Sequence, residues 1–230
     1  MKKLLLLIFV SCMALPGWSQ EETNKYLHSD GDGWGLKIVQ PEGEKNILLI
    51  GNSVCNGYKG YVAKEMPDYR VIAWVNPYHL KSEHLYDDLV KVLNSEEWDV
   101  IHFNIGLHGW PEGRIPKGMY QPLLQNFVDT LKRYALNSKF IWASITPITN
   151  KEKPFTTNAE LNPIIADRNR IATIIMKNNN IPINDLYSLC LLNMSLARGD
   201  RFHWTTPMYR MMAIQVASKI EDVLSENKEK

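Results

Sequence analysis

The segment Asn46-Ile-Leu-Leu-Ile-Gly51-Asn-Ser53 is the strongest indication of the fold of this chain. A short run of consecutive apolar residues that ends in glycine is typical of a strand buried on both faces. Strands of this kind occur in parallel sheets that are covered by helices on each side. The residues that follow Gly51 are therefore expected at the carboxyl end of a central strand, where a loop leads into a helix.

Four later segments share this apolar character. They are residues 69–75, 99–106, 139–145 and 181–185, the last a short edge strand in which Pro182 is tolerated. Between them, apolar residues recur at the spacing of amphipathic helices. Such faces lie within residues 85–93, 123–131, 164–175 and 211–220. The alternation predicts one three-layer α/β/α domain around a mainly parallel five-stranded sheet.

The first residues have the layout of a targeting segment. Lys2 and Lys3 precede an apolar stretch, and small residues come before an expected cut after Ser19. This layout is typical of a secretory signal peptide, and the apolar stretch is too short to span a membrane as a helix. Residues 1–19 are therefore interpreted as a signal peptide, so that the mature chain is secreted or periplasmic. A lipid anchor on Cys12 is the less favoured alternative.

Residues 20–44 are polar and rich in glycine, and they are interpreted as an irregular leader before the domain, residues 45–226. The chain has 26 Lys and Arg against 25 Asp and Glu, so removal of the two lysines of the signal peptide leaves 24 against 25, a net charge of −1. No basic stripe is present, so the sequence does not favour nucleic acid as a partner.

Two cysteines, Cys55 and Cys190, remain in the mature chain. They are far apart in sequence, so the sequence leaves open whether they pair. The spacing of His102, His108 and His203 matches no common set of zinc ligands. Neither a metal nor an organic cofactor is expected.

Chemically capable side chains follow the predicted strands. Ser53 comes directly after the first strand, and His108 comes shortly after the third. Because the working groups of parallel sheets gather at the carboxyl ends of the strands, both are expected at one edge of the sheet. Near the C-terminus, Asp200 precedes His203 by three residues, so its carboxylate can hold the imidazole for a second partner. Each of these residues taken alone has a structural explanation.

Taken together and in this order, the three segments resemble the SGNH (GDSL-type) hydrolase family, over about residues 47–220. The phrase Trp98-Asp-Val-Ile-His-Phe-Asn-Ile-Gly-Leu-His108 is similar to a branch of the family with Gly-Leu-His in its third motif. The resemblance implies a flavodoxin-like fold and a catalytic triad of Ser53, His203 and Asp200. It also implies an oxyanion hole formed by the Ser53 N–H and a side chain of the third motif.

Three departures from the family pattern matter. Asn52 replaces the Asp that precedes the nucleophile, and Asn can make similar turn hydrogen bonds. His108 stands where the family has an oxyanion-binding Asn; a neutral imidazole can donate one N–H, with Asn104 as the fallback donor. The second motif lacks its glycine, so the backbone N–H of Lys81 or Ser82 is the remaining option there.

Aromatic residues flank the expected site. Trp110, Tyr78 and Trp204 are candidates for stacking on sugar rings, although packing is the more usual role of aromatic side chains. The resemblance implies a serine esterase, with an acyl group on a carbohydrate as the expected substrate. A lipid or other carboxylester acylhydrolase is the first alternative. A carbohydrate-binding protein that keeps the fold without the activity is the alternative from another class.

Overall fold

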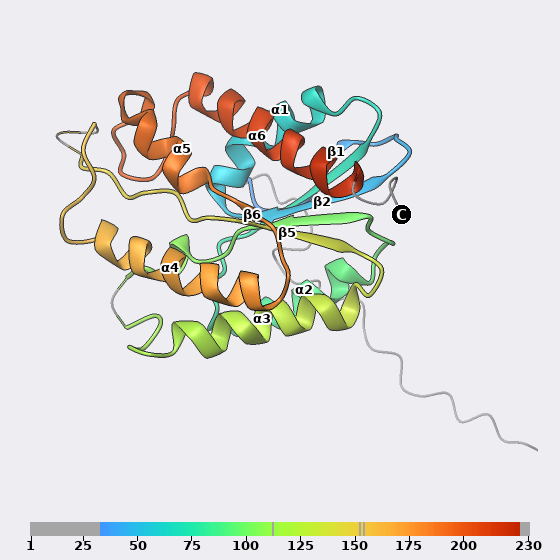
Figure 1. Ribbon diagram of the computed structural model, residues 1–230, viewed down its shortest axis with the longest axis horizontal. Helices are drawn as coiled ribbons and strands as arrows, with labels where there is room; N and C mark the ends of the chain where they lie inside the picture. Colours follow the sequence, from blue (N-terminus) through green and yellow to red (C-terminus); the bar gives the residue numbers. More distant parts are fainter. Residues whose placement is uncertain (1–32, 112, 152, 154, 226–230) are drawn as a thin grey trace, which may run out of the picture.

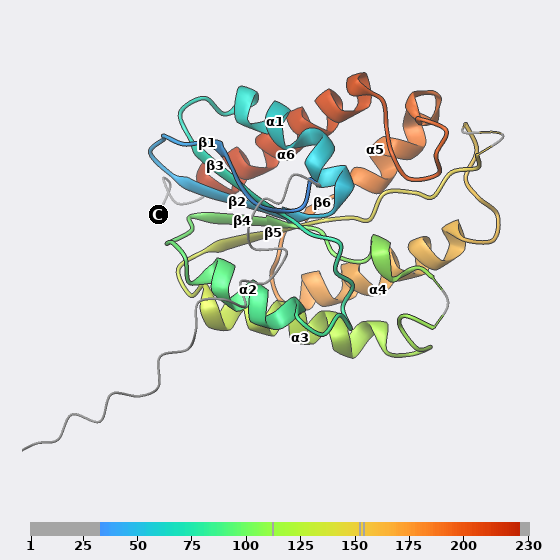
Figure 2. The same ribbon diagram turned by 180° about the vertical axis from the view of Figure 1, so that it is seen from behind.

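The computed structural model describes residues 33–111, 113–151, 153 and 155–225. The predicted signal peptide, with Cys12, and the first part of the predicted leader lie outside these residues. A six-stranded sheet lies between two layers of helices (Figures 1 and 2). No helix in the described part of the chain has the length and apolar character needed to cross a membrane.

The five predicted strands are present, and they run parallel. They are β2 (Asn46–Gly51), β3 (Arg70–Val75), β4 (Val100–Phe103), β5 (Lys139–Ala143) and β6 (Ile183–Asn184). The strand order is β1-β3-β2-β4-β5-β6, so the short β6 lies at an edge as expected. The prediction of a mainly parallel α/β sheet is therefore confirmed, with one strand more than the sequence indicated.

The additional strand is β1 (Gly35–Gln40), which pairs antiparallel with β3 at the other edge of the sheet. The prediction that residues 20–44 form an irregular leader is wrong for this part. Leu36 lies opposite Trp74, and Ile38 lies opposite Ile72. This pairing with β3 accounts for the strand, because antiparallel strands need only one buried face.

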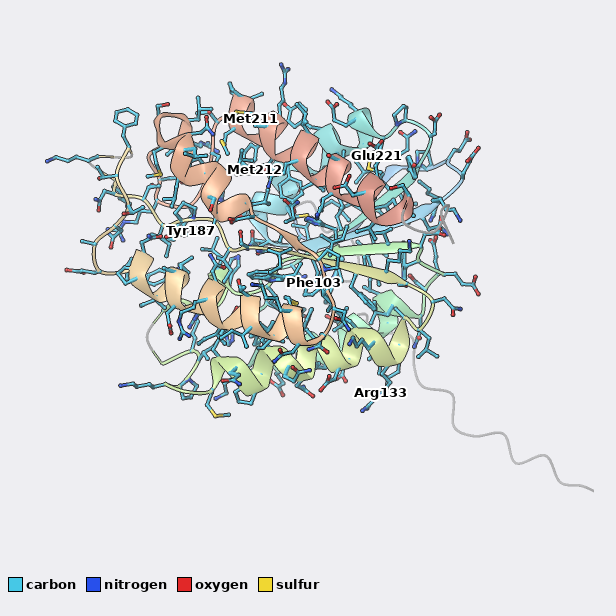
Figure 3. The ribbon with its side chains drawn as sticks, in the orientation of Figure 1. Phe103, Arg133, Tyr187, Met211, Met212 and Glu221 are labelled. Carbon is cyan, nitrogen blue, oxygen red and sulfur yellow. The ribbon has the colours of Figure 1, made fainter. Side chains whose placement is uncertain are left out.

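Helices cover both faces of the sheet (Figures 1 and 2). One layer holds α1 (Ser53–Glu65), α5 (Leu186–Leu192) and α6 (Thr206–Ser225). The other layer holds α2 (Leu85–Leu93), α3 (Tyr120–Tyr134) and α4 (Asn162–Asn178). Figure 3 shows the contrast between Phe103 in the middle of the sandwich and Arg133 on the outer side of α3.

Strand β2 has an apolar core on both of its faces. Ile47 and Leu49 pack in the core beneath α1 and α6, whereas Leu48 and Ile50 pack in the core beneath α2 and α3. All four side chains are at most 1 % exposed. This double burial explains why an uninterrupted apolar run, rather than an alternating pattern, marks the strand.

The strand order determines where a site can form. The chain leaves β2 for α1 on one face of the sheet, and it leaves β4 for α3 on the other face. Because β2 and β4 are neighbours, the connections diverge at their carboxyl ends and leave a crevice there. Ser53, the first residue of α1, lies beside this crevice. The 3-10 turn Leu107–Gly109 follows β4 on its other side.

Candidate active site

Ser53 is placed by the sharp change from β2 to α1. Asn52 is the N-cap residue of α1, and its side chain accepts a hydrogen bond from the Val54 N–H at 2.9 Å. Asn52 thus makes the turn contact expected at this position. The Ser53 N–H belongs to the first turn of the helix, where backbone donors have no partner within the helix. The positive end of the α1 dipole therefore lies at the Ser53 hydroxyl.

The structure brings Ser53, His203 and Asp200 into one chain of hydrogen bonds. The Ser53 Oγ lies 2.9 Å from His203 Nε2, and His203 Nδ1 lies 2.8 Å from Asp200 Oδ2. A carboxylate on the Nδ1 side favours the tautomer that carries its proton there. In that tautomer Nε2 is free to accept the Ser53 hydroxyl proton, which is the arrangement needed to activate a weak nucleophile.

The loop that carries Asp200 and His203 is held in a tight form. Its two strands are joined by the hydrogen bonds Arg198 N–H to His203 C=O and Thr205 N–H to Leu196 C=O, each 2.9 Å long. Arg201 at the tip has φ +82°, a conformation that costs energy for a residue with a side chain. Strained residues of this kind persist where the surrounding structure holds them.

Asp200 is bound by the same loop on both of its oxygens. Its Oδ1 accepts the backbone N–H groups of Phe202 and His203 at 3.1 and 2.8 Å. Burial alone would raise the pKa of Asp200, but these hydrogen bonds, the contact with the His203 ring and its charge outweigh it, so the pKa lies below its usual value. The carboxylate is therefore ionised at neutral pH and oriented toward the imidazole.

A cavity of about 340 Å³ opens beside Ser53. Its walls are mostly aromatic or apolar, with one permanent positive charge. They are formed by Trp34, Ser53, Leu107, His108, Trp110, Pro111, Arg114, Phe202 and His203. Trp110 stacks on Phe202 with ring centroids 6.0 Å apart, and Trp34 meets the His108 ring edge-on at 5.8 Å. The cavity can thus hold a small group against flat rings.

Five of these wall residues were not predicted as site residues, namely Trp34, Leu107, Pro111, Arg114 and Phe202. Leu107, Pro111 and Phe202 are immediate sequence neighbours of predicted residues, whereas Trp34 and Arg114 are not. Trp34 lies just before β1, in the segment interpreted as a leader, and Arg114 lies in the loop after the 3-10 turn. A tryptophan directly before a strand-like segment was the only available signal for Trp34. Nothing in the sequence distinguishes Arg114 from other surface arginines.

His108 lines the same cavity as Ser53 and His203. Burial lowers its pKa to about 4, and the positive charges of Arg114, His79 and His203 act in the same direction. The ring is therefore neutral at neutral pH, so that it carries one N–H. Its Nε2 is buried, and no hydrogen-bond partner is found for it among the described residues.

The fallback donors suggested by the sequence are already engaged. The Asn104 side-chain amide donates to the Ala143 carbonyl at 2.7 Å, and Asn104 does not line the cavity. In the turn after β3, the Lys81 N–H contacts His79 Nδ1 at 3.2 Å, and the Ser82 N–H donates to the His79 carbonyl at 2.8 Å. Both bonds lie within the turn, so neither the Lys81 N–H nor the Ser82 N–H is offered to the cavity.

Two of the three predicted substrate-binding aromatics lie in the interior instead. Tyr78 is 7 % exposed, and its hydroxyl donates to the Asp88 carboxylate on α2. Trp204 is 1 % exposed and belongs to the core beneath α1 and α6. Their assignment to the substrate is wrong because both side chains are needed for packing. Trp110 lines the cavity, and its contact with substrate stays a prediction.

Within the described ranges, no three His, Cys, Asp or Glu side chains are grouped as a metal site requires. His102 is fully buried in β4 and does not line the cavity. Cys55 and Cys190 are both buried and unpaired. The cavity beside Ser53 thus combines a hydroxyl that is hydrogen-bonded to an imidazole, a second, neutral imidazole, a permanent cation and aromatic walls.

Comparisons with known proteins point to one kind of fold. No family model matches the sequence, and no curated protein matches it. Among solved structures, Axe2, an acetylxylan esterase from Geobacillus stearothermophilus, is similar with a TM-score of 0.60 at 14% identity, over 79% of this chain and 96% of that one.

Two further solved structures agree with this likeness. The acetyl xylan esterase AlAXEase gives a TM-score of 0.62 at 16% identity, over 76% of this chain and 99% of that one. A protein of Parabacteroides merdae described as a GDSL-like lipase gives 0.60 at 14% identity, over 78% and 96%. At such identities the likeness concerns the fold.

Proposed function

We propose that this chain, whose fold is that of the SGNH (GDSL-type) hydrolases, is an exported serine esterase that removes an acyl group from a carbohydrate. The observation that carries the proposal is the unbroken contact from Ser53 Oγ to His203 Nε2 at 2.9 Å and from His203 Nδ1 to Asp200 at 2.8 Å. Three residues from two distant segments have no packing reason to meet in this geometry. They are the groups that acyl transfer requires.

In the proposed mechanism Ser53 Oγ attacks the ester carbonyl while His203 Nε2 takes the hydroxyl proton. The imidazolium that forms lies against the ionised Asp200, which stabilises it. The negative charge that develops on the carbonyl oxygen is stabilised by the Ser53 N–H at the start of α1 and by an N–H of the neutral His108 ring. His203 then returns the proton to the leaving alcohol, and water repeats the attack on the acyl-enzyme.

The cavity supports a small acyl group and a sugar as the alcohol. A volume of about 340 Å³ is at the lower end of ligand sites, and its Trp34 and Trp110 rings suit the apolar faces of pyranose rings. Two of the similar structures are named as acetyl xylan esterases, which supports an acetyl group in particular. Export rests on the signal-peptide layout of residues 1–19.

One observation favours the lipid or carboxylester acylhydrolase as a second candidate. A larger groove of about 900 Å³ shares Trp110 and Pro111 with the cavity, and Ile115, Ile164 and Ile171 add to its walls. An acyl chain of several carbons would find apolar surface there. A series of esters from acetyl to octanoyl separates the candidates: a maximum at acetyl supports the carbohydrate esterase, and a rise with chain length supports the acylhydrolase.

The test of the proposal is hydrolysis of an acetyl ester by the purified chain and by Ser53→Ala. Ser188→Ala is the matched control, because Ser188 is an exposed serine in the first turn of α5. We expect Ser53→Ala to lower kcat by about 10⁴-fold or more and Ser188→Ala to leave it unchanged. Activity that survives in Ser53→Ala would refute the assignment. An inactive wild-type chain that binds acetylated oligosaccharides would support the non-catalytic alternative.

A further inference from the structure

Two arginines hold the turn that carries His108. Arg168, on α4, donates through Nη1 to the Gly106 carbonyl at 3.2 Å and through Nη2 to the Gly109 carbonyl at 2.8 Å. Arg114 donates through Nη1 to the His108 carbonyl at 2.7 Å. Arg168 thus bridges the two ends of the turn. In the sequence, His108 lies between Gly106 and Gly109, whose carbonyls Arg168 binds.

The turn is built around the Arg168 guanidinium. A side chain at Gly109 would place its Cβ 3.0 Å from Arg168 Nη1 and 2.6 Å from Ile115 Cδ1, so glycine lets the backbone approach the guanidinium closely. Gly106 has φ +152°, and a Cβ there would lie 2.4 Å from Ile145 Cδ1. Glycine therefore lets both ends of the turn pack closely against their neighbours, and at Gly106 it also accommodates the positive φ.

Arg168 is also an unusual residue to find inside a protein. It is 7 % exposed, its guanidinium carbon lies 5.2 Å from the centre of the Tyr120 ring, and no ion pair involving it is found among the described residues. Burial lowers its pKa, but an arginine stays charged at neutral pH. A buried cation without a direct ion pair is costly, and an apolar side chain would fill the same space at less cost.

We infer that Arg168 is a positioning residue that holds residues 106–109 so that the His108 ring faces the cavity beside Ser53. This inference rests on the proposed function, because it assigns to His108 a role in stabilising the reaction. The planar guanidinium suits the task, since its donors can reach two carbonyls at once in a fixed geometry. Without it, both carbonyls would require water, and the turn would lose the contact that fixes its distance from α4.

The test compares Arg168→Ala and Arg168→Lys with Arg170→Ala. Arg170 is the matched control, because it lies on the same helix but is exposed and paired with Asp167. We expect Arg168→Ala to lower kcat by about 10–10²-fold with KM changed little, as a misplaced catalytic group does. Arg170→Ala should behave as the wild type. Arg168→Lys should remain close to Arg168→Ala, because a compact ammonium cannot bridge the two carbonyls in the same way.

Chemical rescue distinguishes positioning from general stability. Guanidinium ion at non-denaturing concentration should restore part of kcat to Arg168→Ala by filling the vacated site, and it should not stimulate Arg170→Ala or His108→Ala. The double variant Arg168→Ala/His108→Ala should be no slower than His108→Ala alone, because Arg168 acts through His108. Wild-type kcat in a folded Arg168→Ala, full activity in Arg168→Lys, or losses that multiply in the double variant would each overturn the inference.

A second readout does not depend on activity. The pKa of the His108 ring, followed by NMR, is expected near 4 in the wild type. In the folded Arg168 variant it should rise toward the usual value of about 6.5, because a loosened turn admits water to the ring. If Arg168→Ala does not fold, Arg168→Lys takes its place. A His108 pKa that stays near 4 in the folded Arg168 variant overturns the inference. A wild-type protein that does not hydrolyse the ester counts only against the proposed function.

Discussion

The buried His102 in β4 makes the stability of this protein depend on pH. Its Nε2 lies 3.1 Å from Asn184 Nδ2, and Asn184 Oδ1 accepts from Gln215 Nε2 at 2.7 Å. In this arrangement the Asn184 NH₂ group faces the ring and donates, and His102 Nε2 accepts. A proton on Nε2 would destroy this bond and place a charge in the core. The ring is therefore held neutral.

The size of the effect follows from the shift in pKa. Burial lowers the pKa of His102 from 6.5 to about 4. Because the unfolded chain takes up the proton first, the folded state loses stability as pH falls from about 6.5 to about 4 and loses none from this group below that. The free energy of unfolding should be lower by about 2 kcal/mol at pH 5 than at pH 7, and by about 3 kcal/mol at pH 4.

The assay is urea unfolding at pH 7, 6 and 5 for the wild type and for His102→Gln. Glutamine keeps an acceptor for Asn184 and does not titrate. The variant should therefore lose about 2 kcal/mol less than the wild type over this range, while the contribution of His108 is present in both proteins. Asn184→Asp should weaken the dependence, because a carboxylate beside the ring favours its protonation. Parallel pH curves for the wild type and His102→Gln would refute the reasoning.

Two further predictions concern the site. In Asp200→Asn the amide Nδ2 would replace Oδ2 beside His203 Nδ1 and donate to it, leaving the imidazole proton on the Ser53 side. The kcat for an acetyl ester should fall by about 10⁴-fold, and the melting temperature should stay almost unchanged. A decrease in kcat of less than tenfold would exclude Asp200 as the partner of His203. Trp34→Ala removes the edge-on contact with His108, so kcat/KM should fall by about 2–10-fold. Trp34→Phe should keep most of the wild-type kcat/KM, because it keeps an aromatic ring there. Equal losses in both variants would contradict a role for the ring contact.

Much of the fold was readable from the sequence because its strands are buried on both faces. The apolar runs of β2, β3, β4 and β5 leave few alternatives. β1 was missed because most side chains of this edge strand are only partly buried, so it has no continuous apolar run; Ile38, for example, is 65% exposed. The helix α5 was missed as well, because its seven residues follow directly on the predicted strand at residues 181–185 and Asp185 begins the helix as its N-cap.

The site was readable where position in a parallel sheet decides it. Ser53 and His108 were expected at one sheet edge from their positions, and the family resemblance joined the Asp200–His203 pair to them. The structure places Ser53, His108 and His203 around one cavity, with Asp200 bound to His203. The wall residues were harder, because composition does not reveal which face an aromatic residue occupies. Tyr78 and Trp204 look like Trp110 in the sequence, yet each packs in the interior. The role of Arg168 depends on a contact across more than fifty residues that no local pattern encodes.

The hydrogen bond between Ser53 and His203 joins residues 150 positions apart. Under the proposed function, a ribosome must therefore synthesise almost the whole domain before the chain can attack any ester. Fragments that end before the loop with Asp200 and His203 should be inactive, and esterase activity should return only in the final stage of refolding. For an exported enzyme this delay has a protective effect, because a nascent chain cannot deacylate metabolites of the compartment in which it is made.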